Sequence, residues 1–184
     1  MNKTLLIILA LVAVLTVGAF SSYNGLVGMN ENVNGKWSQI ENQLQRRADL
    51  IPNLVNTVKG YAAHEQAAIQ SVSDARAKLA GAQGPAAKAQ ANGEMNSALS
   101  RLLMVAENYP NLKADQNFRS LMDELSGTEN RIAVARKDYN DAVQGYNTKI
   151  RSFPSNVFAG MFGFGAKEYF KADEGAKQVP QVQF

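Results

Sequence analysis

His64 is the only histidine among the 184 residues of this chain, and Glu65 follows it directly. This pair is where acid–base or metal chemistry would be sought. A carboxylate-bridged di-metal site in a helical bundle needs two Glu-x-x-His units, and a zinc site needs more nitrogen or sulfur ligands than one histidine supplies. The chain also has no cysteine. We therefore expect ordinary hydrogen bonds for His64 and Glu65, and we predict no catalytic residue, no cofactor and no metal.

Arg46, Arg47 and Asp49 form a second charged group, beside an apolar helical stripe that Arg47 is placed to enter. One interpretation is a binding patch for an acidic partner or a lipid headgroup. The other is an ion pair inside the fold, with a carboxylate such as that of Glu65, Asp123 or Glu124. We favour the ion pair, because a buried guanidinium without a partner is very costly.

Glycine-rich sequence precedes Lys167 and superficially resembles a phosphate-binding loop. It lacks the adjacent Gly-Lys-Ser/Thr and the preceding strand that such a loop uses. The aromatic residues in this segment are better interpreted as hydrophobic anchors: Phe158, Phe162 and Phe164. They are expected in the membrane interface, on the helical bundle or against a neighbouring subunit.

The elements that position these residues are helical, because apolar residues recur every three or four positions from Tyr23 to Ile150. The first stripe includes Trp37 and reaches Ile51. Pro52 either kinks this helix or lies in the first turn of the next one, expected over residues 53–80. A Gly/Pro turn over 81–85, a helix over about 86–108 and a long heptad-patterned helix after Asp115, its expected N-cap, complete the pattern. The sequence thus predicts an all-α, coiled-coil-like, antiparallel four-helix bundle behind an N-terminal transmembrane helix.

Residues 4–20 contain no charge and are long enough for a short membrane span. The residues expected to face lipid are Leu5, Leu6, Ile7, Ile8, Leu9, Leu11, Val12, Val14, Leu15, Val17 and Phe20. Val17-Gly18-Ala19 also resembles a signal-peptidase site, so cleavage after Ala19 is the alternative. We favour an uncleaved anchor, because the apolar run exceeds the usual signal-peptide core and helical sequence continues beyond it.

Lys3 precedes the apolar run, and no Lys or Arg follows before Lys36. The positive-inside rule then predicts a single-pass protein of the inner (cytoplasmic) membrane, with a cytoplasmic N-terminus and the bundle on the outer, periplasmic side. The formal net charge of +3 is small and the basic residues are scattered among acids, so we expect no nucleic-acid partner. The expected division is an anchor over 1–22, a bundle over 23–154 and a Gly/aromatic tail over 155–184. The tail is expected to pack on the bundle, the membrane or a neighbouring subunit.

The run from Trp37 to Val55, continued from Val58 to Glu65, resembles the LemA family. Tyr23-Asn24, Phe153-Pro154, Gly163-Phe164, Tyr169-Phe170 and the segment from Pro180 to Phe184 also resemble that family. The resemblance covers essentially the whole chain and implies an N-terminal transmembrane helix followed by a long antiparallel helical bundle. It implies no established enzymatic activity and supplies no catalytic or ligand residues.

The leading hypothesis is a non-catalytic, membrane-anchored scaffold of the bacterial cell envelope that forms homo-oligomers or recruits another envelope membrane protein, with membrane lipid as a further partner. One alternative is an accessory subunit of an envelope protease or signalling complex, and another is a membrane-remodelling protein. An enzyme with an unusual site around Arg46, Asp49, His64 and Glu65 is the least favoured.

Overall fold

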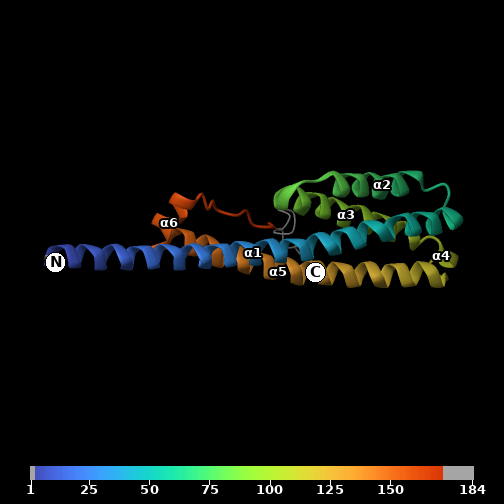
Figure 1. Ribbon diagram of the computed structural model, residues 1–184. Helices are drawn as coiled ribbons and strands as arrows, with labels where there is room; N and C mark the ends of the chain where they lie inside the picture. The colour runs from blue at the N-terminus through green and yellow to red at the C-terminus, as the bar shows by residue number, and fades with distance from the viewer. Residues whose placement is uncertain (1–2, 172–184) are drawn as a thin grey trace, which may run out of the picture. The chain divides into compact units, whose positions relative to one another are not determined.

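The computed structural model describes residues 3–171, and these residues form helices and no strand (Figure 1). The helices are α1 (Lys3–Tyr61), α2 (Gln66–Gly81), α3 (Gly84–Ala106), α4 (Pro110–Ala114), α5 (Gln116–Arg151) and α6 (Ser155–Phe162). The predicted all-helical class is confirmed. Residues 1–2 and 172–184, including the motif from Pro180 to Phe184, lie outside the described residues.

The described residues divide into two compact units. The first unit contains residues 3–37 and 138–168, and the second contains residues 38–137 and 169–171. Helices α1 and α5 each contribute to both units. The units are described separately below.

In the first unit, α1 packs against the last part of α5. Leu26 and Val33 of α1 are buried, as are Val143 and Tyr146 of α5. A Cβ atom added at Gly145 of α5 would lie 3.6 Å from the terminal methyl carbon of Met29 on α1. The two helices are therefore in van der Waals contact along this stretch.

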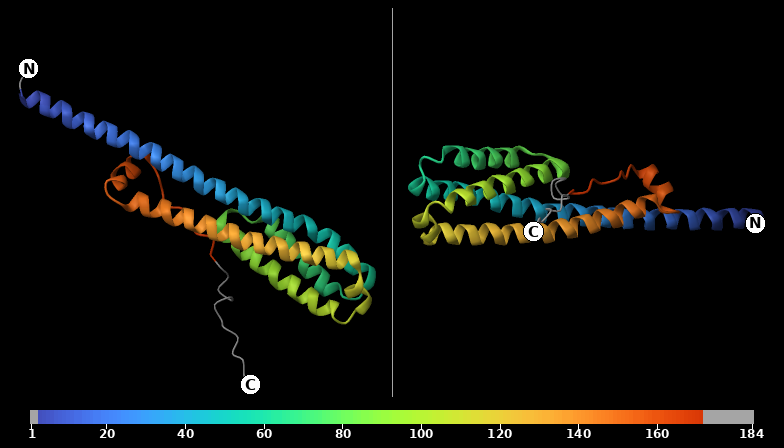
Figure 2. Two further views of the ribbon diagram at one scale, coloured as in Figure 1. Left: turned by 90° about the horizontal axis from the view of Figure 1, so that it is seen from below. Right: turned by 180° about the vertical axis from the view of Figure 1, so that it is seen from behind.

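In the second unit, most positions of the apolar stripes predicted from the sequence are buried. Their largest fully or nearly fully buried members are Ile40, Leu44, Ile51, Leu54, Val72, Leu79, Met95, Leu102, Phe118, Leu125 and Ile132. Helices α2 and α3 pack against each other and lie side by side in both views of Figure 2. Each of the helices α1, α2, α3 and α5 therefore contributes a buried apolar stripe to this unit.

Helix α1 continues through Pro52 to Tyr61, so Pro52 does not begin a new helix as one of the two predictions had it. A proline inside a helix cannot donate to the carbonyl four residues earlier, here that of Ala48. Nε of Arg76 on α2 donates to this carbonyl oxygen at 2.8 Å. The orphaned acceptor therefore has a tertiary partner, and this removes one cost of keeping the proline inside the helix.

The chain leaves the helix at residues 62–65, so the single helix predicted over 53–80 is wrong. No proline or glycine lies within these four residues, and Gly60 is the nearest residue of either type. The phenol of Tyr61 donates to Asp115 at 2.9 Å, and that of Tyr109 donates to Glu65 at 3.0 Å. Long-range contacts of this kind hold the break, and local spacing cannot reveal them.

Two predicted boundaries are confirmed. Helix α2 ends at Gly81 and α3 begins at Gly84, whose φ of 75° lies in the left-handed region that favours glycine. Pro85 occupies the first turn of α3. Asp115 caps α5, because its Oδ1 accepts a hydrogen bond of 2.9 Å from the backbone N–H of Phe118.

Candidate functional site

The apolar N-terminal part of α1 is long and apolar enough, by length and composition, to cross a membrane. Its predicted lipid-facing residues lie on the helix with exposed side chains, apart from the Leu15 side chain, which is outside the described set. The hydroxyl of Thr16 donates to the carbonyl oxygen of Val12 at 2.7 Å. An internally satisfied hydroxyl is what a helix in hydrocarbon requires.

Aromatic residues surround the end of this apolar stretch. The ring of Tyr23 meets that of Phe162 edge-on at a centroid distance of 5.0 Å and that of Phe164 at 5.9 Å. A cavity of about 660 Å³ opens beside them, lined by Thr16, Ala19, Phe20, Tyr23, Phe158 and Phe162. The three phenylalanines predicted as hydrophobic anchors therefore lie in the first unit, two of them in ring contact with Tyr23.

Gly163 turns the chain so that Phe164 can reach Tyr23. Gly163 ends α6 with a φ of 74°, in the left-handed region, and the N–H of Phe164 donates to the carbonyl of Ala159 at 2.9 Å. A side chain at position 163 would be strained in this conformation. Gly163 thus serves to terminate α6.

The segment after α6 is fastened to α5 by hydrogen bonds. The buried side-chain amide of Asn147 donates to the carbonyl of Lys167 at 2.9 Å and accepts from its N–H at 2.8 Å. The phenol of Tyr139 donates to the carbonyl of Glu168 at 2.8 Å. Burial raises the pKa of this phenol, with a smaller contribution from Glu168, so it stays a donor at neutral pH.

Trp37 also belongs to the first unit. Its ring lies 5.4 Å from that of Tyr139 at an interplanar angle of 55°. Asp138, which precedes Tyr139 on α5, forms an ion pair with Lys36, which precedes Trp37 on α1. Its Oδ2 lies 3.0 Å from Nζ of Lys36. The structure therefore places Trp37 in a helix–helix contact between α1 and α5.

A buried polar network occupies the second unit. Arg47 is only 3 % exposed, and it donates to Glu129, to Oδ1 of Asn92 at 2.7 Å and to Oδ1 of Asn96 at 2.5 Å. Asn96 also donates to Glu129 at 3.3 Å. Burial lowers the pKa of Arg47 and the Glu129 charge opposes that shift. Because arginine has so high an intrinsic pKa, we treat the guanidinium as charged.

Arg46 and Asp49 are exposed, and each has a local partner. Arg46 pairs with Glu124 at 2.6 Å, one of the carboxylates predicted for this arginine pair. Asp49 accepts a hydrogen bond of 2.8 Å from Gln45, one helical turn earlier. Arg46, Arg47 and Asp49 therefore do not converge on one point, and the partner of Arg47 is Glu129, which the sequence had not singled out.

His64 and Glu65 lie in the break between α1 and α2. His64 is exposed, whereas the half-buried Glu65 accepts from Tyr109. That hydrogen bond is the main reason why the pKa of Tyr109 is raised. Within residues 3–171, no three His, Asp or Glu side chains gather closely enough to hold a metal ion.

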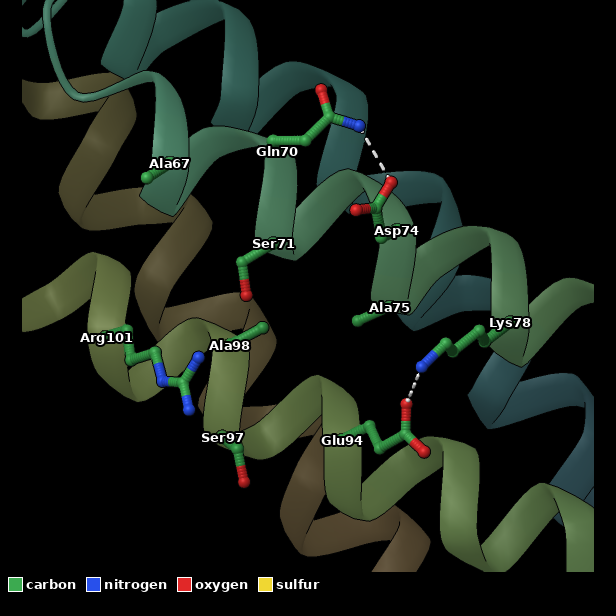
Figure 3. Close-up of a pocket in the computed structure, with 10 residues that line it drawn as sticks. All are labelled: Ala67, Gln70, Ser71, Asp74, Ala75, Lys78, Glu94, Ser97, Ala98 and Arg101. Carbon is green, nitrogen blue, oxygen red and sulfur yellow. Dashed lines mark hydrogen bonds and ion pairs between the residues drawn. The ribbon is translucent and has the colours of Figure 1, made fainter.

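A polar groove of about 630 Å³ runs between α2 and α3 (Figure 3). Its floor carries small residues such as Ala75 and Ala98. Lys78 and Glu94 bridge it at 2.6 Å, and this contact is the main reason why the pKa of Lys78 is raised and that of Glu94 is lowered. The groove thus contains an exposed cross-helix ion pair, an ordinary feature of a solvated helical surface.

Comparison with known proteins gives the family. Residues 36–184 match the model of the LemA family. Magnetosome protein MamQ 2 of Paramagnetospirillum magneticum is 33% identical, over 89% of this chain and 71% of its own length. Magnetosome protein MamQ of Magnetospirillum gryphiswaldense is 31% identical, over 89% and 69%. Protein LemA of Metamycoplasma hominis is 25% identical, over 88% and 76%.

The fold defines a class of helical proteins in which an exposed apolar N-terminal helix is continuous with amphipathic helical sequence. Within that class, the chain belongs to the LemA family, as the motifs from Trp37 to Glu65 predicted.

Several residues that organise the structure were missed by sequence reasoning. Asn92, Asn96 and Glu129 accept hydrogen bonds from the terminal nitrogens of Arg47, and Asn147 fastens the segment after α6. Asn92 and Asn147 lie beside buried positions of the helical stripes, and this position in the sequence pattern could have indicated that they are buried. It reveals burial, but it does not identify the partner.

Proposed function

We propose that this protein is a non-catalytic, membrane-anchored helical scaffold of the bacterial cell envelope, which self-associates or recruits a protein partner. The observation that carries the proposal is the division of α1 into two kinds of sequence. Residues 4–20 are uncharged, and their large apolar side chains that the structure describes are exposed, whereas the stripe from Leu26 to Val58 is buried in protein. One helix therefore offers both a lipid-compatible surface and a protein core.

The proposal includes an antiparallel, coiled-coil-like four-helix bundle over residues 38–137. Lys78 and Glu94, close to the α2–α3 turn, pair with each other, and Gln70 and Arg101, farther from the turn, line the same groove. Arg46 and Arg47 add contacts from α1 to α5 and α3. Such pairing supports helices that run in alternating directions around one core.

The proposed location is the inner membrane, with the N-terminus in the cytoplasm. The support is the charge pattern, in which Lys3 precedes the apolar run and the next basic residue is Lys36. A reporter enzyme fused after Phe184 should be active on the periplasmic side. Activity confined to the cytoplasm would contradict this orientation.

The absence of catalysis is also part of the proposal. It is supported by the separation of the candidate groups, since His64 is exposed while Glu65 and Asp49 have other partners. Purified protein should leave envelope extracts chemically unchanged. Conversion of an extract component that is lost in His64→Ala would instead support an enzyme.

The scaffold role is tested by extracting the full chain from membranes in mild detergent and measuring its mass and stoichiometry. We expect a homo-oligomer or a complex, and cross-linking in intact membranes should capture the same contacts. Parallel anchors raise the effective concentration of the helical parts, which favours association.

The same experiment separates the alternatives. One foreign protein recovered in stoichiometric amount would favour an accessory subunit of an envelope complex over self-assembly. Monomers alone, both in detergent and after cross-linking, would contradict the scaffold.

A further inference from the structure

Exposed apolar side chains in the first unit are not confined to the N-terminal apolar stretch. Phe153, just before α6, is 84 % exposed, and Val157 and Met161 on α6 are 52 % and 72 % exposed. These residues are four positions apart, so Val157 and Met161 share one face of α6. The opposite face carries Ser155 and Ala159, which are buried. Large apolar side chains exposed together on one helix face indicate an interaction site.

The charge pattern indicates what this surface contacts. Residues 152–166 contain no Asp, Glu, Lys or Arg. Basic residues lie on both sides at Lys149, Arg151 and Lys167, and one acid, Glu168, lies beside Lys167. An apolar helix face flanked by cations is typical of a helix that lies in the membrane interface, where cations meet anionic headgroups. The basic residues of these flanks outnumber the one acid, an excess that a protein partner would not require.

The position of α6 supports the same occupant. Tyr23 is in ring contact with Phe162 of α6, and Thr16, Ala19 and Phe20 line one cavity with Phe158. At 1.5 Å per residue, residues 4–20 rise about 25 Å, less than the hydrocarbon thickness of about 30 Å. If those residues span the bilayer, Phe20 and Tyr23 mark its boundary, and α6 packs at that depth.

We propose that α6 is a second membrane contact, lying at the boundary between lipid headgroups and acyl chains. Val157, Met161 and Phe153 contact acyl chains, whereas Lys149, Arg151 and Lys167 lie near anionic phosphate groups. The cavity beside Phe20 and Phe158 accommodates a lipid acyl chain. This inference rests on the proposed function in one respect, because the N-terminal anchor determines the depth of α6 in the bilayer.

Because the chain has no cysteine, single cysteines can be labelled specifically. The full-length variants Leu9→Cys, Met161→Cys and Ser100→Cys carry an environment-sensitive fluorophore and are reconstituted into phosphatidylcholine/phosphatidylglycerol vesicles. Nitroxide lipids with the nitroxide at a shallow or a deep carbon quench the label according to depth. Leu9 reports the anchor, Met161 reports α6, and Ser100, exposed on α3, is the control.

We expect shallow nitroxides to quench the Met161 label several-fold more than the Ser100 label, and deep nitroxides to quench the Leu9 label. Quenching at Leu9 with none above control at Met161 would overturn this inference and leave the anchor intact. Loss of quenching at both sites would overturn the proposed function as well. Energy transfer between labelled copies at Met161 without lipid quenching would assign the surface to a second copy of the chain.

A charge variant tests the headgroup contact separately. In Lys149→Gln/Arg151→Gln, we expect shallow quenching at Met161 to fall on anionic vesicles and to change little on pure phosphatidylcholine. An equal change on both kinds of vesicle would contradict a role for anionic headgroups. Circular dichroism shows whether the variant keeps its helix content.

Discussion

The two units differ in their most unusual groups. The second unit buries a charged guanidinium, Arg47, and surrounds it with amide and carboxylate oxygens. The first unit leaves large apolar side chains such as Phe20 and Met161 exposed. A unit that buries polar groups needs an exact set of partners, whereas a unit that exposes apolar groups needs an apolar environment. We infer that the second unit carries the specificity of the helical packing and the first carries attachment to lipid.

The largest expected effect is at Arg47. Arg47→Ala removes the partner of Glu129 and Asn92. Because the Glu129 side chain is 38 % exposed, we expect the low end of the range for breaking a buried pair, about 3 kcal/mol. Arg46→Ala is the matched control, because the exposed Arg46–Glu124 pair is worth at most about 1 kcal/mol. Urea unfolding of the detergent-solubilised chain measures both. Equal effects at the two positions would contradict the comparison.

The variant Arg47→Met separates the effect of losing the charge from the effect of losing side-chain volume. Methionine fills similar volume without a charge, so destabilisation should be smaller than for Arg47→Ala. If Arg47→Met kept full stability but abolished an interaction seen in cross-linking, the binding-patch interpretation would replace the structural one.

Asn147 provides the corresponding test in the first unit. Asn147→Ala removes two hydrogen bonds to the backbone of Lys167, which are together worth about 2 kcal/mol. The effect should be local, with faster hydrogen exchange of the Lys167 amide. Asn156→Ala, at an exposed position of α6, should leave that exchange rate unchanged. An unchanged exchange rate of the Lys167 amide in Asn147→Ala would show that Asn147 does not hold the segment after α6.

The pairing of Arg76 with the carbonyl of Ala48 predicts a coupling to Pro52. Arg76→Ala should cost about 1.5 kcal/mol, since a charged donor is lost from a carbonyl that has no helical partner. In a Pro52→Ala background residue 52 regains its N–H, so Arg76→Ala should cost less. A double-mutant cycle by urea unfolding measures the coupling, and strictly additive effects would contradict it.

The smallest expected effect is the pH dependence of the α5 cap. The backbone N–H of Phe118, followed by the Tyr61 phenol, lowers the pKa of Asp115 in the folded state. The charged cap therefore adds stability at pH values above the unfolded pKa of about 3.9, and this stability is lost as pH falls through the folded pKa. Asp115→Asn should reduce the fall of Tm with acidification between about pH 5 and pH 2. Parallel pH profiles for the two proteins would argue against this cap.

The helical stripes could be read from the sequence because burial repeats with the helix period. Leu26, Ile40 and Leu125 are buried where three- and four-residue spacing predicted. The Gly84 turn and the Asp115 cap were equally predictable, because both depend on local residue types. What the sequence could not show were partners set by tertiary contact.

The break at residues 62–65 is one such case, held by Tyr61 and Tyr109 through carboxylates distant in sequence. The choice of Glu129 for Arg47 is another, since Asp123 and Glu124 lie on the same helix and spacing alone does not select among them. The family resemblance was confirmed over residues 36–184, but it supplied no catalytic or binding residue to test.

An intact-mass measurement shows whether the N-terminal apolar stretch is retained in the membrane. Membranes from cells that produce the chain are washed with alkaline carbonate, and the mass of the retained protein is determined. We predict retained protein whose mass includes residues 4–20. A carbonate-soluble protein that begins after Ala19 would contradict the anchor and replace it with a cleaved signal.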